Sequence, residues 1–245
     1  MQGGQAGTHG PLVEVLALLG VGIMIERPIL FNGEMVRAVL NGSKTQTRRV
    51  AKLSDRGHLV LERNRHHTVC ARMTNDGPEW TPAGSGPSEP LPQSHIDAAC
   101  PYGAPGDRLW VRETFRVSRA YDCLPPKRVK ASIYHYAADG RPSQQGYGFR
   151  WGKVRQSIFM PRWASRISLD VLTIRVERLQ AITADGARAE GHPVDPARSR
   201  DQEVHDDASL DWFMDLWDDI NGKKPGRAWA DNPWVWVVGF KRCGQ

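Results

Sequence analysis

The 245-residue sequence has no long hydrophobic run and few cysteines. The first absence bears on whether the protein spans a membrane, and the second on whether it is a secreted disulfide scaffold. It contains no stretch of about 18 uncharged apolar residues, the length that a membrane-spanning helix needs. The four cysteines lack the dense, even spacing of a secreted disulfide scaffold, which favours a reducing cytoplasm. Because 40% of the residues are hydrophobic, the chain can fill a core, and we expect a soluble globular protein.

Several common catalytic motifs are also missing. The chain has no Walker loop, no dinucleotide-binding glycine fingerprint, no nucleophile elbow and no His-Glu-x-x-His, which excludes P-loop nucleotide hydrolysis. A zinc site could draw on His66, His67, Cys70 and Cys100, but the close ligand pairs typical of such sites are missing. No metal ion or other cofactor is therefore predicted.

Charge is distributed unevenly along the chain. The 33 Lys and Arg exceed the 27 Asp and Glu by six, yet residues 201–219 hold eight acids and no Lys or Arg. The remaining residues therefore carry 33 basic against 19 acidic side chains, a net charge of +14. This asymmetry predicts a positive region for an anionic partner, of which nucleic acid is the commonest. Ordinary charge for solubility explains it equally well.

Residues 1–23 differ from the rest, with a Gly-rich polar start followed by an apolar stretch that lacks the basic residues of a signal peptide. We expect translation to begin at Met24 and residues 24–245 to form one domain. Pro, Gly and Ser enrichment, or weak periodicity, predicts three insertions, at about 51–100 (loop-rich), 117–157 and 193–230.

Hydrophobic periodicity and capping residues predict the ordered elements. The predicted helices span 33–41, capped by Asn32, then 183–190, capped by Thr183, and about 210–221. The predicted strands span 44–50, 108–115, 166–179 and 234–240. The apolar face of 166–179 changes phase, which predicts a β-bulge, and the last strand is apolar on both faces, which predicts cover on both sides.

Basic and aromatic side chains are interleaved in the insertion at 117–157, including Lys127, Arg128, Tyr134, Tyr136 and Trp151. Such a pattern can stack nucleobases in a single-stranded nucleic acid. Aromatics that merely anchor a long loop to the body produce the same pattern, and this is the commoner situation.

One short segment carries the strongest chemical signal. Gly42, Lys44, Thr47 and Arg49 follow a predicted helix end, where they form a cradle for an anion or polar group at the mouth of a strand. The segment resembles the ASCH family, a PUA-like mixed β-barrel, whose signature is Gly-x-Lys-x-x-Glu-x-Arg. Thr47 stands at the Glu position, as in the small N4-acetylcytidine amidohydrolases of that family. The resemblance implies an α+β fold, a barrel with flanking helices and long loop insertions.

The same resemblance extends to the segment 182–190 and places Glu190 in the family's catalytic set. It implies that Thr47 attacks an amide carbonyl, Lys44 takes the hydroxyl proton and Glu190 protonates the leaving amine. Similarity also covers residues 106–112 and 236–240.

The sequence leaves three functions open. The first is recognition of RNA or a modified nucleobase in a basic pocket at the barrel rim, with nucleic acid contacted by Lys44, Arg48, Arg49 and Arg112. The second is hydrolysis of an acylated cytidine. The third is a role in phage morphogenesis, since segments such as Cys100-Pro-Tyr-Gly look like long ASCH proteins of phages and prophages, which implies the host cytoplasm as location.

Overall fold

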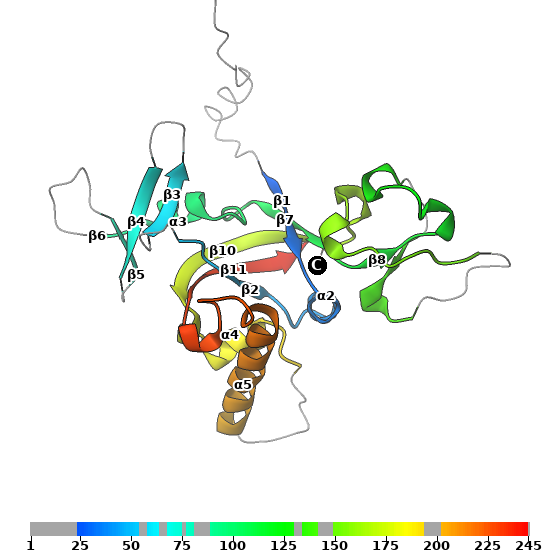
Figure 1. Cartoon of the computed structure of the whole chain (residues 1–245). Helices are drawn as coiled ribbons and strands as arrows, with labels where there is room; N and C mark the ends of the chain where they lie inside the picture. The colour runs from blue at the N-terminus through cyan, green and yellow to red at the C-terminus, as the bar shows by residue number, and fades with distance from the viewer. Residues whose placement is uncertain are drawn as a thin grey trace, which may run out of the picture.

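The computed structural model describes residues 24–53, 58–63, 68–74, 77–80, 89–129, 134–141, 149–193 and 202–244. Residues 1–23, which we expected to precede the true start at Met24, lie outside these ranges. Within them the protein is a mixed α+β fold around a five-stranded sheet (Figure 1). In spatial order the strands are β1 (Glu26–Leu30), β7 (Arg108–Arg112), β10 (Ser168–Arg178), β11 (Trp234–Arg242) and β2 (Gln46–Val50).

The central sheet is mixed and open. Strand β1 runs parallel to β7, and the other three pairings are antiparallel. No ladder joins β1 to β2 among the described residues, so the closed barrel implied by the resemblance is not formed there. The chain between these two edge strands instead folds into α2 (Gly33–Leu40). Across this gap, Arg49 Nη2 donates to the carbonyl oxygen of Leu30 at 2.8 Å.

Helix α2 confirms the helix predicted at 33–41. The Asn32 side chain accepts a hydrogen bond from the Met35 amide at 2.8 Å and so caps the first turn. Met35, Val36 and Val39 are buried on one face, as their spacing predicted. The helix ends at Asn41-Gly42, where Gly42 takes a φ of +83° that favours glycine.

Strands β10 and β11 form the centre of the sheet. Their register shifts between Val171 and Thr173, which confirms the predicted bulge. Strand β11 is buried on both faces, also as predicted. Trp236 and Val238 pack into the main core with α2, whereas Val235 and Val237 pack into a second cluster with the later helices.

Two helices cover the face of the sheet that carries Val235 and Val237. These are α4 (Ala184–Ala189), capped by Thr183 as predicted, and α5 (Gln202–Asn221). Helix α5 ends where it was predicted to end but begins at Gln202, well before the predicted start at about 210. Phe213 and Trp217 of α5 pack against β11, as core aromatics. In Figure 1 both helices lie on one side of the sheet, with α5 projecting away from it. Among the described residues, no helix is long and apolar enough to cross a membrane.

Most of the described residues in the segment 51–100 lie in strands and a helix, so the prediction that the segment is loop-rich was wrong for them. The segment contains a four-stranded antiparallel sheet and helix α3 (Gln93–Ala99). The strands are β3 (His58–Arg63), β4 (Thr68–Thr74), β5 (Gly77–Trp80) and β6 (Glu89–Pro90). Antiparallel ladders satisfy the backbone even where the side chains are polar, which is why a hydrophilic, Pro-rich composition concealed them.

Strand β7 ends at Arg112, whereas the sequence predicted a strand that continues to residue 115. A separate lobe of the protein follows β7. It holds the short strands β8 (Phe115–Arg116) and β9 (His135–Tyr136). Its 3-10 helices are η2 (Arg119–Tyr121), η3 (Pro126–Arg128), η4 (Ala137–Asp139), η5 (Ser157–Phe159) and η6 (Arg162–Ala164). Tyr134 and Tyr136 pack against a small core around Phe115 and Met160. The anchoring interpretation of these two aromatics is therefore confirmed.

Candidate functional site

Lys44 and Glu190, 146 residues apart in the chain, form a buried ion pair. Lys44 Nζ donates to Glu190 Oε2 at 2.7 Å and to the Glu190 carbonyl oxygen at 2.8 Å. The two side chains are only 0% and 3% exposed. Local structure explains why these two residues are in contact. Glu190 caps the C-terminal end of α4, and its backbone forms a β-bridge with the backbone of Lys44, which lies just before β2.

Arg48 adds a second cation to the same carboxylate. Its Nη1 donates to Glu190 Oε1 at 3.2 Å, and its Nη2 donates to Glu177 Oε1 at 2.6 Å. Both oxygens of Glu190 are therefore held in place by buried donors. A buried charge is tolerated only when it is paired in this way. Lys44, Arg48 and Glu190 therefore behave as one network.

The ammonium of Lys44 lies in an environment that disfavours its charge. Burial, the largest effect, lowers the pKa of Lys44 below its ordinary value, and nearby Arg49 and Arg48 lower it further. The Glu190 carboxylate opposes this shift of the Lys44 pKa. The lysine is thus easier to deprotonate than a surface lysine, which is the property a general base requires.

Thr47 is completely buried on the other face of the same strand. It pairs with Val238 of β11, so its side chain faces the main core, whereas Arg48 pairs with Val237 and faces α4 and α5. Its hydroxyl is buried and has no hydrogen-bond partner among the described residues. The structure therefore joins Lys44 to Glu190 directly, and shows no hydrogen bond from Thr47 to either.

The four cations predicted to contact nucleic acid are all engaged within the protein. Lys44 and Arg48 are buried in the ion-pair network. Arg49 and Arg112 are half-buried, and each guanidinium lies over an aromatic ring and donates to main-chain carbonyl oxygen. In the conformation described, none of the four presents a freely exposed head.

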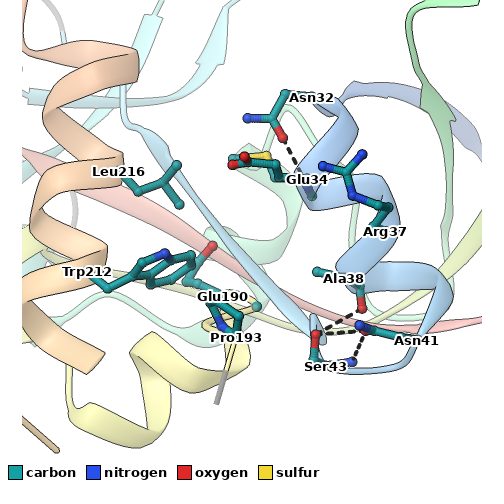
Figure 2. Close-up of a pocket in the computed structure, with 12 residues that line it drawn as sticks. Asn32, Glu34, Arg37, Ala38, Asn41, Ser43, Glu190, Pro193, Trp212 and Leu216 are labelled. Atoms are coloured by element: carbon teal, nitrogen blue, oxygen red, sulfur yellow. Dashed lines mark hydrogen bonds between the residues drawn. The ribbon is translucent and has the colours of Figure 1, made fainter. Parts of the chain in front are cut away.

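A pocket of about 410 Å³ opens between α2 and α5, and Glu190 lies on its wall (Figure 2). Neither Lys44 nor Thr47 lines it. The lining residues come from the α2 region, from the end of α4 and from α5, and are Asn32, Glu34, Met35, Arg37, Ala38, Asn41, Ser43, Glu190, Gly191, Pro193, Trp212 and Leu216.

The pocket wall is not basic, in contrast to the predicted pocket. It carries two carboxylates, Glu34 and Glu190, and one guanidinium, Arg37. Trp212 and Leu216 of α5 supply an apolar side facing α2 (Figure 2). Sequence analysis did not identify these two residues, because hydrophobic periodicity predicts a helix but does not show which element its side chains face. Trp212 adjoins buried Phe213 but is itself only half-buried, so its side chain is available to the pocket.

No metal centre emerges from the described ranges, which hold no group of three or more His, Cys, Asp or Glu suited to a metal ion. His66 and His67 of the zinc alternative lie outside the described residues. Comparison with known proteins adds no identity, because no protein-family model, no curated protein and no solved structure matches this chain.

Proposed function

We propose that the protein is an ASCH-like, PUA-like protein of phage or prophage type that recognises a nucleobase of RNA, or a modified nucleoside, in the α2–α5 pocket. One observation carries the proposal: Glu190 lines the pocket, and its buried carboxylate is held in place by Lys44 and Arg48. Support for the family comes from the contact between Lys44 and Glu190, the two residues that the resemblance assigns to one site.

The chemistry of the wall favours a base that presents hydrogen-bond donors. An ionised carboxylate only accepts hydrogen bonds, and each of its oxygens has a second lone pair beyond the one used by Lys44 or Arg48. The exocyclic amine of cytosine is the partner that Glu commonly accepts from. Trp212 offers a ring on which a base can stack. A cytosine-type base therefore fits better than uracil, which presents an acceptor at the same position.

Nucleoside binding tests this proposal directly. We expect cytidine to bind more tightly than uridine by about 5-fold to 150-fold, the range for one good base-edge contact. Trp212→Ala should weaken cytidine binding by a similar factor, through loss of stacking. Isothermal titration calorimetry with the four common nucleosides and N4-acetylcytidine measures both effects.

Asp211→Ala is the matched control for this experiment. It alters the neighbouring, exposed residue of α5, which does not line the pocket, and should leave the affinity unchanged. Equal affinity for cytidine and uridine, or equal effects of the two substitutions, would rule out base recognition in this pocket.

Hydrolysis of an acylated cytidine is a second candidate, favoured by the lowered pKa of Lys44 and by its contact with Glu190. Thr47 would supply the nucleophile, since its buried hydroxyl has no hydrogen-bond partner among the described residues. The acyl carbonyl would gain the threonine oxygen, the amide bond to the cytosine amine would break, and water would then release the acid.

Incubation with N4-acetylcytidine distinguishes the hydrolase from the binder. The hydrolase predicts release of cytidine and acetate by the parent protein, and loss of more than about 100-fold of this activity in Thr47→Ala, since nothing replaces the nucleophile. Thr45→Ala, at an exposed position of the same segment, should keep the activity. Binding of N4-acetylcytidine without turnover would leave recognition alone.

A further inference from the structure

The lobe that follows β7 carries a strong positive charge. We define the basic lobe as residues 115–129, 134–141 and 149–164. These ranges contain nine Arg and Lys against two Asp, a net charge of +7. The whole chain carries only +6, so the lobe alone exceeds the net charge of the protein.

Most of these cations are exposed and unpaired. Arg119, Lys127, Arg128, Arg150 and Lys153 are all exposed, and no ion pair engages them within the part of the chain that the structure describes. This is the reverse of the state of Lys44, Arg48, Arg49 and Arg112, which are buried or half-buried. Like charges concentrated without counterions raise the free energy of the folded lobe, and an anionic partner would relieve that repulsion.

Main-chain hydrogen bonds hold these cations on a fixed scaffold. The Arg119 amide donates to the Arg150 carbonyl oxygen at 2.9 Å, which places these two residues side by side. Buried Arg155 donates to the Tyr121 and Leu124 carbonyl oxygens, at 2.6 and 3.1 Å, and so ties the segments of η2 and η3 to the strand side of the lobe. An ordered surface loses less conformational entropy on binding than a flexible basic tail.

Exposed aromatic rings accompany the charge. Phe159 and Trp163 are 58% and 44% exposed, although both are large and apolar. Trp163 lies 5.5 Å from the ring of Tyr134, which supports it from one side. Exposed rings and cations on one lobe are the combination that binds single-stranded nucleic acid, since bases stack on the rings while Arg and Lys follow the phosphates.

The opposite charge lies on another part of the molecule. Helix α5 contains seven Asp and Glu and no Lys or Arg. Figure 1 shows α5 and the lobe around β8 leaving the sheet in different directions. A polyanion attracted to the lobe therefore lies away from the acidic side chains of α5.

We propose that the basic lobe is the surface on which this protein holds the backbone of single-stranded RNA, with Phe159 and Trp163 stacking bases. The inference rests on the proposed function, because it supplies the backbone contacts for the RNA whose base enters the α2–α5 pocket. It assigns phosphate binding to the lobe and base recognition to the pocket.

Neutralising the lobe tests the proposal. The variant combines Arg119→Gln, Lys127→Gln, Arg128→Gln and Lys153→Gln, and a fluorescently labelled 20-nucleotide RNA of mixed sequence serves as probe. We expect its affinity at 0.1 M salt to fall about tenfold or more, and the slope of log affinity against log salt to fall by up to about 3, at roughly 0.7 per lost phosphate contact. Fluorescence anisotropy at several salt concentrations gives both values.

A variant of equal charge change provides the control. Lys52, Lys223, Lys224 and Lys241 are exposed and lie outside the lobe, so their replacement by Gln should change the affinity less than about twofold. Phe159→Ala with Trp163→Ala should weaken binding about fivefold or more and leave the salt slope unchanged. Circular dichroism checks that each variant stays folded.

Three outcomes would overturn the inference: no salt-dependent RNA binding by the parent protein, equal losses in the lobe variant and its control, or capture of phosphatidylserine vesicles in place of RNA through the two aromatics. Nucleoside titration separates this failure from that of the pocket. If the parent binds RNA through the lobe but binds no nucleoside, only the pocket proposal fails. If nucleosides bind and the lobe variant retains full RNA affinity, only the lobe proposal fails.

Discussion

Replacing Glu190 with Gln is expected to lower the free energy of unfolding by about 3–5 kcal/mol, because it removes the charge that compensates a buried ammonium. The Lys44 side chain is 0% exposed and has no other carboxylate partner among the described residues. Arg48 loses less electrostatic stabilisation than Lys44, because it also pairs with Glu177. Urea denaturation, with the slope m compared between variants, measures the effect.

A double-mutant cycle separates the charge effect from general damage. Lys44→Met in the Glu190→Gln background removes the uncompensated ammonium, so it should cost less there than in the parent, or restore part of the lost stability. Asp219→Ala, at an exposed position of α5, should stay within about 0.5 kcal/mol of the parent. Additive losses from the two buried substitutions would mean that Lys44 and Glu190 do not act as a pair.

Gly191→Ala is expected to destabilise the protein by about 2–5 kcal/mol. Gly191 has a φ of +99°, a conformation that costs an L-residue about 1–2 kcal/mol. A Cβ there would lie 2.8 Å from the Ala38 Cβ and 3.2 Å from the Lys44 Cβ, and overpacking of this kind adds about 1–3 kcal/mol. The substitution should also weaken cytidine binding, because Gly191 lines the pocket and follows Glu190 directly.

Gly42→Ala isolates the backbone contribution. Gly42 has a similar φ of +83°, but a Cβ there would meet no atom within 4 Å. It should therefore cost only the conformational part, about 1–2 kcal/mol, and leave cytidine binding unchanged. Thermal or urea unfolding together with nucleoside titration compares the two glycines, and equal effects on both measurements would contradict a packing role for Gly191.

Local signals in the sequence were sufficient for most elements around the site. Asn32 and Thr183 cap the helices they were expected to cap, and the phase change in β10 marks a real bulge. These features depend on neighbours within a few residues, which is why they can be inferred without the fold. Prediction failed for β3 to β6, because the Pro, Gly and Ser content around these strands indicated loop and their pairing with one another arises only on folding.

The resemblance in sequence identified Lys44, Thr47 and Glu190 as candidate site residues. It did not predict how these side chains are arranged relative to one another. The structure pairs the lysine with the glutamate and turns the threonine toward the core, because adjacent strand residues face opposite sides of the sheet. It also shows that the pocket lies between α2 and α5. Trp212, on a helix outside the segments that resemble the family, is one of the lining residues.

The sequence by itself determined the helices and strands around the site, the chemistry of the three candidate residues and the uneven charge of the chain. Only the tertiary structure decided which cations are exposed, which carboxylate lines a pocket and that the described sheet stays open. The physical reason is that capping, periodicity and charge are local properties of the chain, whereas burial, pairing and cavity shape arise between segments that meet only after folding.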